Sequence, residues 1–207
     1  MTGGNLLCFV LVITNVCYRA ALAAFAVIVV VVETGPYWLR IRQFQNCPKQ
    51  EVAMEKPRCD MHPSSVFRYN HTIKSPVIDL NMTLSNRVFD RGASTMTLDV
   101  SRWDTVSGWR THFLVMSLGE LCFIYEDVVA DIVKYLAEIA GIPTKCPIAD
   151  GTYRGVNCVV QLPPLRHFPS LPYGRYKVYI LVGYFKSSNP KELRSCLKAI
   201  ADVVPRT

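Results

Sequence analysis

Alternating apolar and polar positions predict β-strands over most of the chain after residue 65. In the run 93–103, Met96, Leu98 and Val100 fall on one side, while the residues between them are polar. The run 175–184 places Tyr176, Val178, Ile180, Val182 and Tyr184 on one face. Similar runs cover residues 66–73, 77–84, 109–116 and 193–203. Short strands at this spacing are typical of a β-sandwich.

One segment has a different period. Within residues 120–140, Leu121, Ile124, Val128, Ile132 and Leu136 recur at helical spacing. A glycine and a proline follow at 141 and 143, as expected just after a helix. The pattern therefore predicts an all-β sandwich with one α-helix inserted between mid-chain strands.

The first thirty-odd residues are almost entirely apolar from Leu6 to Val32, broken by Arg19. One interpretation is a signal peptide with residues 20–32 as its apolar core and cleavage near Thr34 or Gly35. The other is an uncleaved membrane anchor, in which Arg19 near the centre would cost about 2.5–3.5 kcal/mol. A cleavage site at 21–23 would leave an apolar tail. We expect residues 1–35 to form the export segment and residues 36–207 to form one domain.

Both interpretations deliver the domain to an oxidising compartment, secreted or extracellular, with a lysosomal lumen or membrane anchoring as alternatives. Two sequons, at Asn70 and Asn81, are expected glycosylation sites.

The chain has eight cysteines, of which Cys8 and Cys17 lie in the export segment. Six cysteines remain, and six cysteines allow 15 different pairings. The six are Cys47, Cys59, Cys122, Cys146, Cys158 and Cys196. No C-x-x-C pair occurs, so we interpret them as structural disulfides, with no metal site.

The formal net charge of +7 favours anionic partners such as phospholipid headgroups or sialylated glycans. The basic residues are scattered and form no nucleic-acid motif, so no nucleic-acid partner is expected. No G-x-S-x-G, H-E-x-x-H or P-loop motif occurs. We therefore expect no catalytic residues, no enzyme activity and no cofactor.

The segment 146–153 reads C-P-x-x-x-G-x-Y and is followed by an apolar, proline-rich stretch at 162–172. Gly174-Arg175-Tyr176 then opens a strand, and Cys196 lies near the C-terminus. This order resembles the ML (lipid-recognition) family, which includes the ganglioside activator, and a related group of secreted insect proteins, some linked to contact chemosensation. The resemblance covers residues 44–203, with Cys47 and Cys122 similar to two further cysteines of the family.

The resemblance implies an immunoglobulin-like two-sheet sandwich, a lipid-binding cup whose splayed sheets hold lipid tails. It also implies the disulfides Cys47–Cys196 and Cys122–Cys146. By elimination, Cys59 would pair with Cys158.

A carrier of apolar ligands needs an apolar wall and rim. The candidate wall residues come from three predicted strands. They are Leu98, Val100, Phe113, Val115, Val178, Ile180 and Val182. The candidate rim is the stretch 162–173, with Leu165, Phe168, Leu171 and Tyr173. Arg166 and His167 are candidates for headgroup contacts. An ordinary packed core and a packed proline-rich crossover have the same composition, so this alternative stays open.

These features lead to two hypotheses. In the first, the protein is a secreted lipid-binding or transfer protein that holds a glycolipid, a fatty-acyl chain or a pheromone-like hydrocarbon. Contact with a membrane surface would accompany this activity. In the second, it is an extracellular module that modulates a receptor or channel, for example in insect chemosensation.

Overall fold

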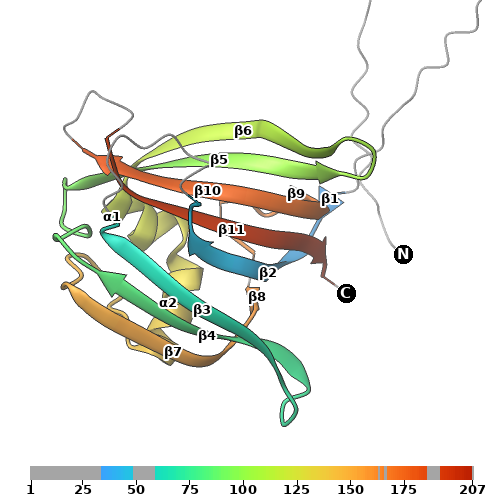
Figure 1. Cartoon of the computed structure of the whole chain (residues 1–207), viewed down its shortest axis with the longest axis horizontal. Helices are drawn as coiled ribbons and strands as arrows, with labels where there is room; N and C mark the ends of the chain where they lie inside the picture. The colour runs from blue at the N-terminus through green and yellow to red at the C-terminus, as the bar shows by residue number, and fades with distance from the viewer. Residues whose placement is uncertain (1–33, 49–58, 163, 166, 186–191, 207) are drawn as a thin grey trace, which may run out of the picture. The chain divides into compact units, whose positions relative to one another are not determined.

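The computed structural model describes residues 34–48, 59–162, 164–165, 167–185 and 192–206. A six-stranded antiparallel sheet, the large sheet, has the order β6-β5-β10-β11-β2-β8 (Figure 1). Its strands are β2 (Tyr37–Asn46), β5 (Ser94–Asp104), β6 (Gly108–Glu120), β8 (Gln161–Leu162), β10 (Gly174–Tyr184) and β11 (Leu193–Pro205). Both long edges of β10 are paired, with β5 and with β11. Its side chains are therefore reached by solvent only across a sheet face.

A three-stranded antiparallel sheet, the small sheet, has the order β3-β4-β7. It consists of β3 (Met61–Asn70), β4 (Ser75–Leu84) and β7 (Gly151–Val159). The two sheets meet where the Ser65 hydroxyl of β3 donates a hydrogen bond to the Phe44 carbonyl of β2, at 2.6 Å. A short two-stranded ladder joins β1 (Thr34–Gly35) to β9 (Leu171–Pro172).

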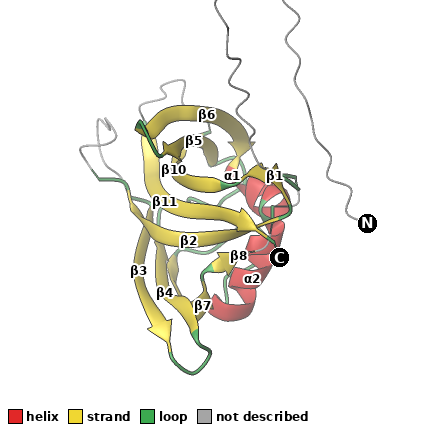
Figure 2. Cartoon of the chain, turned by 90° about the vertical axis from the view of Figure 1, so that its right-hand side faces the viewer, coloured by secondary structure: helices red, strands yellow, loops and turns green. Residues whose placement is uncertain are grey.

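The helical segment begins with α1 (Leu121–Phe123), continues as a π-helical turn, η1 (Ile124–Val128), and ends with α2 (Ala130–Ala140). Figure 2 shows α2 beside β7 and β8. The Tyr135 hydroxyl fixes α2 to β7, since it accepts a hydrogen bond from the Val159 amide at 2.6 Å. Gly141 ends the helix in the left-handed conformation, with φ 64°.

The all-β sandwich with one inserted helical segment is confirmed. The strand predicted at 66–73 begins earlier and ends earlier, at Met61–Asn70. The Asn70 side chain ends it by accepting hydrogen bonds from the amides of Thr72 and Ile73. Residues 1–33 lie outside the described part of the chain. Thr34 and Gly35, at the end of the expected export segment, form β1.

Two of the three expected disulfides are confirmed, namely Cys47–Cys196 and Cys122–Cys146. The pairing of Cys59 with Cys158 is wrong, because both are free thiols. Cys59 precedes Met61, which pairs with Leu84 at one end of β4, whereas Cys158 pairs with Ile78. Six residues of strand separate these levels by about 20 Å, and a disulfide needs Cα atoms within about 7 Å.

A buried ion pair connects β11 to the start of β3. Arg194 and Asp60 are 4% and 1% exposed, and Arg194 Nε donates to Asp60 Oδ2 at 2.7 Å. Arg194 also donates to the Ser94 hydroxyl, at 2.9 Å, and to the Asn86 carbonyl. Asn86 Nδ2 in turn donates to Asp60 Oδ1, at 2.7 Å. Because each charge has several hydrogen bonds, the desolvation cost of burying the pair is offset.

Candidate functional site

The inner face of β10, which faces the small sheet and the helical segment, is the candidate ligand wall. Val182 is fully buried in a core cluster with Leu121 and Leu84. At the other end of the strand, Tyr176 is buried in a second cluster with Tyr37 and Val203. The two clusters close the two ends of the same apolar face.

Between these clusters the apolar face is only half-buried. Val178 and Ile180 are both partly exposed, although they lie on the same face of β10 as Val182. Their cross-strand partners Val100 and Leu98 are partly exposed as well. Ile180 packs against the first cluster, and Val178 and Val100 pack against the second. Since β10 is a central strand, the remaining exposure means that the small sheet and the helical segment cover the middle of the face only in part.

Strand β6 extends this wall through residues that the alternation did not identify. Leu114 pairs with Val100 and Met116 pairs with Leu98, so both lie on the inner face. Val115 pairs with Asp99, which in turn pairs with Tyr179 on the outer face. Val115 is therefore not a wall residue and is 55% exposed on the outer side.

Val115 was wrongly predicted as a wall residue because β6 contains a bulge that the alternation of apolar and polar residues does not reveal. The register shifts between Val100 and Arg102, and His112 takes φ 51° opposite this point. The shift leaves Phe113 beside Tyr176, with ring centroids 6.4 Å apart. The residues after the bulge change faces relative to a regular strand.

The proline-rich stretch 162–173 folds back against the body of the domain. The hydroxyl of buried Tyr37 accepts a hydrogen bond from the Leu165 amide, at 3.1 Å, and donates to the Phe168 carbonyl, at 2.7 Å. Burial raises the pKa of Tyr37, and the Leu165 hydrogen bond lowers it in part. Leu171 and Tyr173 pack against the second cluster. The rim residues are thus held at the end of the wall closed by Tyr176.

Of the two headgroup candidates, Arg166 lies outside the described residues. His167 is exposed, and its Nε2 lies 3.3 Å from Asp127 Oδ2 in η1. The stretch therefore contacts the helical segment through a surface ion pair that forms when the imidazole is protonated.

The helical segment is itself anchored to its disulfide loop by Glu126. Glu126 Oε1 accepts hydrogen bonds from the Cys146 amide and from Arg91 Nη2, both at 2.7 Å. The Cys146 amide and then Arg91 hold the pKa of Glu126 below its usual value, against the opposing effect of desolvation. Burial raises the pKa of Tyr125 to about 12, and its hydroxyl donates to the Pro143 carbonyl at 2.6 Å.

A hollow of about 280 Å³ lies between β2 of the large sheet and the β3–β4 hairpin of the small sheet. Ile41 of β2 lines it from the large sheet, Phe67 and Pro76 line it from the β3–β4 hairpin, and Val160 follows β7. Arg42 and Arg68 also line it. None of the predicted wall residues lines this hollow.

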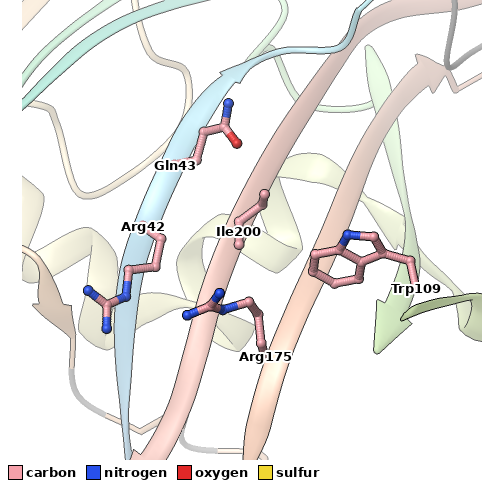
Figure 3. A pocket seen from close by; sticks show the side chains of 5 residues that line it. All are labelled: Arg42, Gln43, Trp109, Arg175 and Ile200. Atoms are coloured by element: carbon pink, nitrogen blue, oxygen red, sulfur yellow. The ribbon is translucent and has the colours of Figure 1, made fainter. Parts of the chain in front are cut away.

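A second hollow, of about 610 Å³, is open on the outer face of the large sheet. Its lining residues are Arg42, Gln43, Trp109, Arg175 and Ile200 (Figure 3). None was predicted as a site residue, because they lie on four strands that no short sequence window brings together. The carboxylate of Asp202 joins its two arginines, accepting from each Nε at 2.8 Å. Burial opposes ionisation of Asp202, but Arg175 and Arg42 together hold its pKa below the usual value.

The two sequon asparagines lie in different surroundings. Asn70 is at the end of β3, where its Nδ2 donates to Asn157 Oδ1 at 3.0 Å. Asn81 is exposed in the middle of β4.

Among the described residues, no group of three His, Cys, Asp or Glu side chains is placed to hold a metal ion. The helices described are all too short or too polar to cross a membrane. No protein-family model matches the chain, and no curated protein matches it.

Proposed function

We propose that the protein binds an apolar chain, such as a fatty-acyl or hydrocarbon group, between its two sheets and carries it without chemical change. The observation that carries this proposal is the half-buried middle of the inner face, between two closed clusters. Val178, Ile180, Val100 and Leu98 form this stretch. A packed core would bury such residues on a central strand, because exposed apolar area forfeits about 25 cal/mol per Å².

The two disulfides add support to the proposal. Cys47–Cys196 and Cys122–Cys146 form as the resemblance to the ML family implies. The second of them ties the start of the helical segment to the loop before β7. This bridge and the Glu126 hydrogen bonds fix the helical segment beside the proposed site.

The test fills the proposed site from one face of β10 and uses the other face as control. Val178→Phe projects a larger side chain into the space between the sheets, whereas Leu181→Phe enlarges the outer face of the same strand. Binding of a dansyl-labelled fatty acid is measured by fluorescence titration of the full chain. Each methylene of the fatty acid that is buried contributes about 0.8 kcal/mol to binding. If the larger ring displaces two of these methylenes, binding of the fatty acid weakens by roughly tenfold.

We expect Val178→Phe to show that loss, Leu181→Phe to bind as the wild type, and both to unfold at the wild-type temperature. Val178 and Leu181 are both only partly buried, so neither substitution enlarges a fully buried side chain. Equal binding by all three proteins, or equal loss in both variants, would exclude the space between the sheets as the ligand site.

A further inference from the structure

All three tryptophans of the chain lie on the outer face of the large sheet, at one end. Trp103 and Trp109 pair across β5 and β6, with their rings 5.3 Å apart. Trp38 pairs with Val204 at the same end of β11. Tyr37 and Leu39, on either side of Trp38, belong to the inner cluster, so Trp38 lies on the outer face.

Cationic side chains lie over or beside these rings. Lys177 Nζ lies 5.1 Å from the centre of the Trp109 ring, and the Arg206 guanidinium lies 4.8 Å from that of Trp38. Arg42 and Arg175 lie in the hollow beside Trp109. Figure 3 shows the Arg175 guanidinium extending over β11 toward Arg42, with Trp109 on the opposite side.

Asp202 positions these two guanidiniums and leaves donors free. It accepts from the Nε of both, and Nη2 of Arg175 is a longer second donor, at 3.4 Å. In the described part of the chain, the Nη groups of Arg42 and Nη1 of Arg175 have no hydrogen bond. Two fixed guanidiniums with open edges suit a phosphate or carboxylate, which takes paired N–H donors.

The β5–β6 turn adds an apolar tip to the basic face. Val106 is 95% exposed and Trp103 is 44% exposed. The tip is held by Asp104 Oδ1, which accepts hydrogen bonds from the amides of Val106 and Ser107, both at 2.9 Å. A fixed turn that exposes valine and tryptophan beside arginines has the composition of a membrane-interface contact.

We propose that this tryptophan–arginine surface, made of Trp103, Val106, Trp109, Arg42, Arg175 and Lys177, docks the protein on an anionic phospholipid bilayer. The tip enters the interface, and the guanidiniums bind lipid phosphates and carboxylates. The inference rests on the outer face alone and does not require a ligand between the sheets. An extended polyanion such as a sulfated glycan would use the cations but would leave Val106 and Trp103 in water.

The β3–β4 turn provides a matched comparison. It also exposes apolar side chains, with Tyr69 at 54% and Ile73 at 51%. Its Arg68 is paired with Asp79 in a bidentate contact, and the turn carries the Asn70 sequon. A glycan at this position would hold the turn away from a bilayer, so it serves as the control tip.

Tryptophan fluorescence of the full chain tests the proposal directly, because residues 1–33 contain no tryptophan. The apolar N-terminal run therefore has no tryptophan fluorophore of its own. Titration with phosphatidylcholine vesicles containing 30% phosphatidylserine should shift the emission to the blue, and brominated lipid should quench it. Vesicles of pure phosphatidylcholine should give neither change. The shift should weaken between 50 and 300 mM salt.

Val106→Asp should weaken the phosphatidylserine-dependent shift at least tenfold, and Ile73→Asp should leave it unchanged. Both substitutions are at exposed turns, so both variants should keep the wild-type unfolding temperature. Arg42→Gln/Arg175→Gln should weaken it by roughly thirtyfold, since each basic residue at an anionic surface adds about fivefold in affinity. Lys74→Gln/Arg154→Gln removes the same charge from the β3–β4 turn and from β7, and should have no effect.

Three results would overturn the proposal. One is a blue shift that is equal on neutral and anionic vesicles. Another is an unchanged titration in Val106→Asp. The third is retention on a sulfated polysaccharide column at 300 mM salt without any shift on phosphatidylserine vesicles, which would assign the cations to a glycan.

Discussion

At the scale of single residues, the buried Arg194–Asp60 ion pair depends on partners from several distant parts of the sequence. Arg194 is bound by Asp60, Ser94 and the Asn86 carbonyl, and its guanidinium lies 5.2 Å from the centre of the Tyr184 ring. These groups come from four separate parts of the chain. Each charge therefore depends on the other being placed correctly when β11 joins the fold.

Replacing one member of this pair should destabilise the protein more than replacing both. Arg194→Met should lower the free energy of unfolding by about 3–5 kcal/mol, because it leaves Asp60 buried and unpaired. The double variant Asp60→Leu/Arg194→Met should lose less, since no uncompensated charge remains. Urea denaturation followed by circular dichroism measures both. A loss below 1 kcal/mol in the single variant would show that the pair is not a buried ion pair in solution.

At the scale of strands and helices, local periodicity predicted most of the elements. The alternation in β5 and β10 and the helical spacing from Leu121 to Leu136 needed no long-range information. The bulge opposite His112 could not be predicted, because it depends on how β6 pairs with β5. Because of this bulge, the alternation predicted Val115 on the inner face when it lies on the outer face. For the same reason it did not identify Leu114 and Met116 as inner-face residues.

The register of the small sheet explains the failed third disulfide in the same way. Cys59 and Cys158 were paired only because they remained after the other four. The positions of Cys59 beside Met61 and of Cys158 opposite Ile78 follow from strand pairing over distances that a sequence pattern does not encode. The other two bridges were predicted from a resemblance that covers their neighbouring residues.

Thiol labelling should distinguish these two cysteines in the native protein. Cys59 is exposed and should react with iodoacetamide, while Cys158 is buried and should react only after unfolding. Burial raises the pKa of the Cys158 thiol, which slows its reaction further. Peptide mass spectrometry of the labelled chain locates each adduct. A disulfide-linked peptide containing both residues would contradict the register of β3, β4 and β7.

At the scale of the whole domain, one sheet presents two different faces. Its inner face is apolar and half-covered in the middle, and its outer face carries arginine, lysine and all three tryptophans. The sequence predicted the apolar residues of the inner wall but not their exposure, because a ligand cavity and a packed core have the same composition. The sequence did not predict the cluster of basic and aromatic residues on the outer face. These residues come from four strands, and only the pairing of those strands in the sheet brings them together.

The central claim is that an apolar chain lies between the sheets, against the middle of β10. The most direct test is X-ray diffraction from crystals of the full chain grown with a fatty acid brominated on its alkyl chain. We predict a bromine anomalous peak between the sheets within about 4.5 Å of Val178 or Ile180. A bromine found only on the outer face beside Trp109, or no bromine bound at all, would contradict the claim.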